Sequence, residues 1–183
     1  MALSASASIK LENAQNLMAA VNFADVSGLR LNTTVNVHWG LVDGCSDPRK
    51  RLAGLIEKAR HWLSHRKIPW TCVWVLEHAT GRALHTHMAI YLPKGRRAEF
   101  KRQLVRWVGH GLPEALNVGQ VNDRGWFGYM LKDVDPVYYS ELGILRRYRK
   151  GRSIRPIVGK RVGVSQNIGQ AARDRWAAAT PLS

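Results

Sequence analysis

The stretch Leu84-His85-Thr86-His87-Met88-Ala89-Ile90-Tyr91-Leu92 alternates in the way that a β-strand requires. Successive side chains of a strand point to opposite faces, so His85 and His87 share one face with Ala89 and Tyr91. Two imidazoles about 7 Å apart on one face can hold a single cation from one side. The competing interpretation is an ordinary pair of half-exposed strand histidines.

A second strand precedes the histidines and predicts a hairpin. Residues 70–77, Trp-Thr-Cys-Val-Trp-Val-Leu-Glu, are rich in β-branched and aromatic residues, and Gly81 provides a turn between the two runs. An odd loop, such as 79–83, places Glu77 on the face of the two histidines, whereas an even loop places His78 there. We favour Glu77 as the third ligand, with His78 as the alternative. A carboxylate with two imidazoles suits Mg²⁺ or Mn²⁺.

A short helix is predicted over 125–133, Gly-Trp-Phe-Gly-Tyr-Met-Leu-Lys-Asp, before Pro136 ends it. Tyr129 and Lys132 are three residues apart and are expected on the same side of this helix. A tyrosine can attack a phosphodiester, and a nearby lysine can neutralise the phosphate. The same pair could instead be an amphipathic tyrosine and a solvated lysine.

The order of these motifs resembles that of the HUH single-strand endonucleases, in which two strand histidines precede a Tyr-x-x-Lys segment. The resemblance covers about residues 31–135, beginning with the strand Leu31-Asn32-Thr33-Thr34-Val35-Asn36-Val37. It departs from the family at Thr86, where a large aliphatic residue is usual. The helix carries one tyrosine, as in single-tyrosine initiators, although Tyr138 and Tyr139 lie nearby as a reserve.

The resemblance implies a ferredoxin-like or RRM-like nuclease fold and a metal-dependent reaction. Tyr129 would attack a scissile phosphate to leave a 5′-phosphotyrosine and a free 3′-hydroxyl, with Lys132 stabilising the developing charge. Glu77, His85 and His87 would hold the Mg²⁺ or Mn²⁺. The substrate would be single-stranded DNA at a hairpin origin, with a host helicase as a candidate partner. A rolling-circle replication initiator is favoured over a mobilisation relaxase or a single-strand transposase.

Composition is compatible with a nucleic-acid partner. The 183 residues carry a formal net charge of +15 and 45% apolar residues, so we expect a folded chain attracted to a polyanion. No apolar stretch reaches the ~18 residues of a membrane span, and the N-terminus is a poor signal peptide. Cys45 and Cys72 are expected as free thiols in the cytoplasm. A phosphate-binding Gly-rich loop is missing from the sequence, so no helicase activity is expected.

The predicted architecture is α+β: a central antiparallel sheet with helices packed mainly on one face. Residues 1–28 are expected to form a flexible or loosely docked tail, 29–145 the catalytic domain, and 146–183 a basic arm with a closing helix. Asp47-Pro48 predicts a helix start. A further helix is expected over 97–108, and a short strand over 116–121.

The basic arm is a candidate nucleic-acid interface. Eight cations occur between residues 146 and 161 with no acidic residue among them: Arg146, Arg147, Arg149, Lys150, Arg152, Arg155, Lys160 and Arg161. A bound phosphate backbone would relieve their mutual repulsion. Trp126 and Tyr148 could stack bases, whereas Trp39 is expected in the core. A non-catalytic nucleic-acid-binding module is the competing hypothesis for the whole chain.

Overall fold

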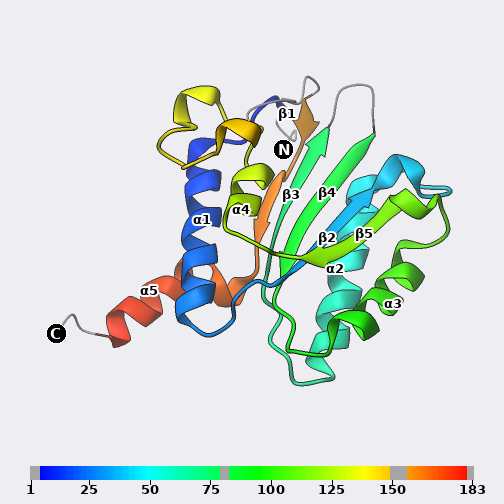
Figure 1. The fold of residues 1–183 in the computed structure, drawn as a ribbon, viewed down its shortest axis with the longest axis horizontal. Helices are drawn as coiled ribbons and strands as arrows, with labels where there is room; N and C mark the ends of the chain where they lie inside the picture. The colour runs from blue at the N-terminus through cyan, green and yellow to red at the C-terminus, as the bar shows by residue number, and fades with distance from the viewer. Residues whose placement is uncertain (1–4, 79–82, 149–155, 181–183) are drawn as a thin grey trace.

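The computed structural model describes residues 5–78, 83–148 and 156–180, and within them the chain forms a five-stranded sheet between two layers of helices (Figure 1). The strands of this sheet are β2 (Thr33–His38), β3 (Cys72–His78), β4 (Leu84–Ile90), β5 (Leu116–Gln120) and β7 (Val162–Val164). Their order is β5-β2-β4-β3-β7, and every neighbouring pair is antiparallel. The predicted α+β class is therefore confirmed.

The helices are α1 (Leu11–Val26), α2 (Pro48–Ser64), α3 (Arg97–Val108), α4 (Gly125–Met130) and α5 (Gln170–Ala179). Two further short strands, β1 (Ala5–Ser6) and β6 (Ile157–Val158), pair with each other. Single 3-10 turns occupy Trp39–Leu41, Pro113–Ala115, Pro136–Tyr138, Arg146–Tyr148 and Gln166–Ile168.

Helices α2 and α3 cover one face of the sheet. Helix α2 begins as predicted, with the Asp47 carboxylate accepting hydrogen bonds from the backbone N–H groups of Arg49 and Lys50. Its leucines and Trp62 pack with Phe100 of α3 against the sheet. The predicted amphipathic stripes of both helices therefore form the larger part of this core.

Helices α1 and α4 cover the opposite face (Figure 1), which differs from the expectation that helices would lie mainly on one face. The expectation of a loose N-terminal tail is also wrong for residues 11–26. Helix α1 buries Leu17 and Val21, and its alanines Ala14, Ala20 and Ala24 are fully enclosed. Small side chains let this helix lie close to the sheet, and an alanine-rich face gives little hydrophobic contrast in the sequence.

The middle residue of the His85-Thr86-His87 motif packs on the α2 side. The Trp39 indole N–H donates to the Thr86 hydroxyl at 2.8 Å, and both side chains are buried. A hydroxyl at this position therefore satisfies a buried indole that an aliphatic side chain would leave without a partner. Trp39 is in the core, as expected.

Candidate active site

The candidate site is built on adjacent rows of the central strands, on the face covered by α4. His38, His85 and Glu77 lie directly opposite one another on β2, β4 and β3. The next row contains Asn36 and His87. Directly opposed residues of neighbouring strands project to the same face, so these polar side chains meet there.

The hairpin register confirms that Glu77, and not His78, shares the face of the two histidines. Glu77 pairs with His85, and His78 pairs with Leu84, which leaves the odd loop 79–83 between the strands. Residue His78 follows Glu77 directly and therefore projects to the other face.

His87 is held by hydrogen bonds at both ring nitrogens. Its Nδ1 lies 2.7 Å from Asn36 Oδ1, and its Nε2 lies 2.8 Å from Glu77 Oε2. The Glu77 carboxylate also accepts a hydrogen bond from the Lys132 ammonium. These side chains are almost completely enclosed, with 5%, 8% and 6% of the His87, Glu77 and Lys132 side chains exposed. A buried charge of either sign is thereby paired.

The pKa of Glu77 reflects this pairing. Burial by itself would raise the pKa of the carboxyl, but the hydrogen bond from His87 and the positive charge of Lys132 together outweigh it. The result is a pKa lowered from 4.5 to about 2, so Glu77 is an anion at neutral pH.

Two further imidazoles extend the site beyond His87. The ring centroids of His85 and His87 are 6.5 Å apart, and those of His85 and His38 are 4.0 Å apart. His38 was not predicted from the sequence. Its only indication was the alternation Thr34-Val35-Asn36-Val37-His38, which puts Asn36 and His38 on one face of β2.

Tyr129 lies above these residues on α4. Its ring centroid is 5.1 Å from that of His87, and the Lys132 Nζ lies 3.8 Å from the centre of the same ring. Helix α4 ends at Met130, earlier than predicted, so Lys132 follows the helix and is not part of it. The two side chains are nevertheless brought together, and Tyr129 stays half-exposed above the buried network.

The neighbouring tyrosines differ from Tyr129 in their surroundings. The Tyr139 side chain is buried, and its hydroxyl donates to the Lys132 carbonyl oxygen at 2.6 Å. Tyr139 thus supports the backbone of the site and has no access to a polymer substrate. Tyr138 is half-buried in the turn that follows Pro136.

The donors on this face have the chemistry that a divalent cation requires, namely imidazole nitrogens and an ionised carboxylate. In the arrangement described, however, Glu77 and His87 bond to each other and to Lys132 or Asn36. No three His, Cys, Asp or Glu side chains converge as a cation site among residues 5–78, 83–148 and 156–180. The donor set fits Mg²⁺ or Mn²⁺ in type, and binding would replace the direct Glu77–His87 contact.

The segment that carries this site also matches a known protein family. Residues 36–136 match the family model of the replication-associated protein ORF2. The chain belongs to this replication-associated family. The matched segment contains Glu77, both motif histidines, Tyr129 and Lys132. No curated protein and no solved structure matches the chain.

Membership of the replication-associated family indicates a role in the initiation of replication, and therefore contact with DNA. In the part of the chain that the structure describes, no helix is long and apolar enough to cross a membrane.

The basic arm of this replication-associated protein begins beside the site. Arg146 and Arg147 are exposed, and the Arg147 guanidinium lies 4.8 Å from the centre of the Tyr148 ring. The Tyr148 ring is in turn 5.7 Å from that of Tyr129. Lys160 is also exposed, at the other end of the arm, beside Trp74. Four of the predicted interface cations lie outside the described residues: Arg149, Lys150, Arg152 and Arg155.

Arg161 does not belong to the nucleic-acid interface, which corrects the prediction. Its side chain is 4% exposed and forms an ion pair with Asp133, itself almost fully enclosed. The backbone enters the sheet at this point, because the Arg161 carbonyl accepts from the Leu76 N–H. The run of like charges in the sequence concealed this partner, since Asp133 is 28 residues away.

Proposed function

We propose that this protein is an HUH-type endonuclease that nicks and rejoins single-stranded DNA through Tyr129. The observation that carries the proposal is the half-exposed Tyr129 ring, in contact with the Lys132 ammonium and beside His87. A nucleophile must be reachable by its substrate, and the groups that assist it must be fixed. Tyr129 is reachable, whereas His87 and Lys132 are held by Glu77.

In the proposed step the Tyr129 oxygen forms a bond to phosphorus while the bond between phosphorus and the 3′ oxygen breaks. The phenol loses its proton and the departing 3′ oxygen gains one, which leaves a 5′-phosphotyrosine and a 3′-hydroxyl. Lys132 stabilises the negative charge that develops as the phosphate is attacked. The bond energy is kept in the phosphotyrosine, so a 3′-hydroxyl can reverse the reaction and reseal the strand.

The proposed cofactor is Mg²⁺ or Mn²⁺, held by Glu77, His85 and His87. When bound, such a cation polarises the non-bridging oxygens of a phosphate as a Lewis acid. Asn36 fixes the His87 ring through its Nδ1, so the Nε2 is left to face the cation side. This assignment of ring nitrogens follows from the observed hydrogen bond.

The proposed substrate is the single-stranded part of a hairpin origin. Arg147 and Tyr148, next to Tyr129, provide a phosphate contact and a ring on which a base can stack. Trp126 is half-exposed on the same helix as Tyr129 and could provide a second stacking surface. Recruitment of a host helicase is part of the same proposal.

The test is formation of a covalent adduct on a denaturing gel with Mn²⁺ and origin-derived single-stranded DNA. The adduct should keep a label placed 3′ of the nick. Tyr129→Phe should abolish it with fold and DNA affinity near normal, since only a hydroxyl is removed. His85→Ala should abolish it and weaken Mn²⁺ binding in a direct titration, and Lys132→Ala should slow it. Tyr138→Phe is the matched control and should leave it unchanged.

Two results would contradict the proposal. An adduct that persists in Tyr129→Phe would move the nucleophile to another tyrosine. DNA binding that is indifferent to chelator, with no adduct on any hairpin carrying the cognate sequence, would favour a non-catalytic binding module. The direct Glu77–His87–Lys132 network would then be a purely structural cluster.

A further inference from the structure

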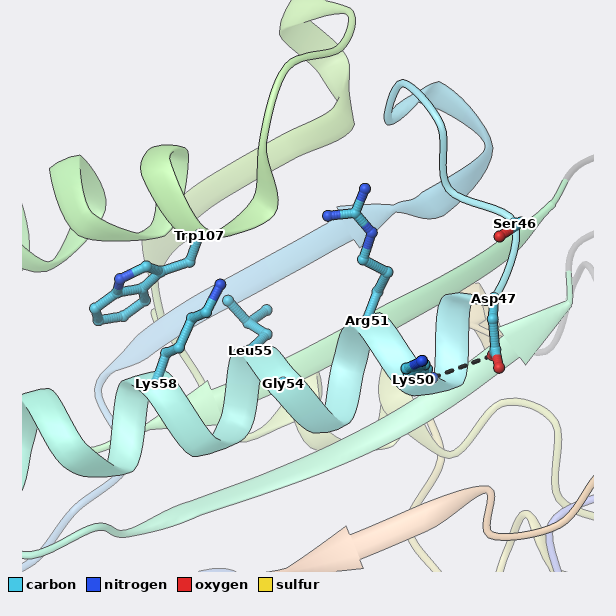
Figure 2. A pocket seen from close by; sticks show the side chains of 8 residues that line it. All are labelled: Ser46, Asp47, Lys50, Arg51, Gly54, Leu55, Lys58 and Trp107. Atoms are coloured by element: carbon cyan, nitrogen blue, oxygen red, sulfur yellow. Dashed lines mark hydrogen bonds between the residues drawn. The ribbon is translucent and has the colours of Figure 1, made fainter.

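A hollow of about 360 Å³ lies between α2 and α3, on the face of the sheet opposite Tyr129. Figure 2 shows Lys50, Arg51 and Lys58 of α2 around it, with Trp107 of α3 at one end. Trp107 is half-buried, and its ring packs edge-on against those of the core aromatics. The hollow therefore combines three cations with one anchored indole.

The three cations differ from their neighbours on α2 in their pairing. Within the part of the chain that the structure describes, no hydrogen bond or ion pair engages the side chains of Lys50, Arg51 and Lys58. Arg60 of the same helix, by contrast, is paired with Glu57 at 2.8 Å. Asp47 also borders the hollow, but its carboxylate caps α2. Positive charge is thus gathered here without the compensation found further along the helix.

Gly54 forms part of the hollow, between Arg51 and Lys58. Glycine is unfavourable in a helix interior compared with alanine. Packing does not explain this glycine, because a Cβ at position 54 would have no atom of the described residues within 4 Å. Lys50, Gly54 and Lys58 are spaced four residues apart and so form one row on α2. A glycine in this row leaves the helix backbone open to whatever the cations bind.

We propose that this hollow binds the phosphodiester backbone of DNA, at a site separate from the one around Tyr129. Lys50 and Lys58 are ~12 Å apart along the helix axis, a length that spans several phosphates of one strand. Their ammonium groups and the Arg51 guanidinium contact phosphate oxygens, the bare backbone at Gly54 admits the strand, and Trp107 packs against a sugar or base. The site does not depend on whether Tyr129 cuts DNA.

The first test places a side chain in the hollow. Gly54→Leu should weaken DNA binding about tenfold, the loss of roughly one charge-assisted contact. Ala53→Leu, an exposed neighbour on the same helix, is the control and should leave the affinity unchanged. Gly54→Ala should raise the unfolding midpoint by ~2–4 °C, because alanine favours the helix. Equal DNA affinity of Gly54→Leu and wild type, with both folded, would overturn the proposal.

The second test removes the charge. A triple change of Lys50, Arg51 and Lys58 to glutamine should flatten the salt dependence of binding by ~2 on a single strand or ~3 on a duplex, in log affinity per log salt. Comparing a single-stranded oligonucleotide with a blunt duplex distinguishes the two sources of phosphate.

The matched control changes three exposed cations outside the hollow, Lys94, Arg102 and Arg106, to glutamine. Equal flattening in both triples would show only a general charge effect and overturn the site. Lysine acetylation mapped by mass spectrometry gives a direct reading: saturating DNA should protect Lys50 and Lys58 but leave Lys94 reactive. Protection by polyglutamate and not by DNA would instead assign the hollow to an acidic protein. Adduct formation on a short oligonucleotide scores Tyr129 separately.

Discussion

Glu77→Gln tests the buried charge network without altering the size of the side chain. The pKa of Glu77 is lowered from 4.5 to about 2, a difference that corresponds to ~3 kcal/mol of folding free energy at neutral pH. Removing one member of a buried ion pair costs a similar ~3–5 kcal/mol, because Lys132 would keep an uncompensated charge. We therefore expect the variant to lose ~3 kcal/mol of unfolding free energy.

The effect should depend on pH in a defined direction. Because the folded-state pKa of Glu77 is below its ordinary value, the carboxylate contributes fully above about pH 5. Its contribution is lost as the pH falls toward about 2. The stability difference between wild type and variant should therefore be constant from about pH 6 to 8 and should shrink with increasing acidity.

The assay is urea unfolding followed by circular dichroism in the presence of a chelator, at a series of pH values. Glu77→Gln combined with Lys132→Met is the control, since it removes both charges and should regain most of the loss. A difference below ~1 kcal/mol at neutral pH, or one that widens in acid, would refute the reasoning. So would a double variant no more stable than Glu77→Gln alone.

Three further changes test other parts of the structure. Arg161→Met should cost ~3 kcal/mol or more of unfolding free energy by leaving Asp133 buried and unpaired, while a DNA-binding titration shows little change. Gly163→Ala should cost ~1–3 kcal/mol and shift the tryptophan emission, because its Cβ would collide with the Trp74 ring. Tyr139→Phe should cost ~1–2 kcal/mol in urea unfolding, yet the covalent adduct should still form if the buried hydroxyl serves only the backbone.

The elements of this fold follow closely from short-range pattern. Residue alternation predicted β3 and β4, and an odd loop over 79–83 explained why Glu77 faces His85. The Asp47-Pro48 pair predicted the start of α2 to the residue. Helix α1 was underestimated because it packs through alanines, whose contrast with polar neighbours is small.

The candidate site shows where local pattern ends. Two histidines and a tyrosine could be selected from the sequence because strand period and helix spacing place each side chain on a face. His38 could not, since its relevance depends on β2 pairing with β4 in one register. The partners of Lys132 and Arg161 were equally hidden, because neither Glu77 nor Asp133 is near them in sequence.

The sequence by itself determined the strands, the amphipathic helices and the face on which His85 and His87 lie, because these depend on residues only a few positions apart. Only the tertiary structure decided that Glu77 binds His87 and Lys132, that Arg161 is a core residue and that cations surround a bare glycine on α2. These features arise when distant segments are packed together, and the balance of burial and pairing then determines which charges stay exposed.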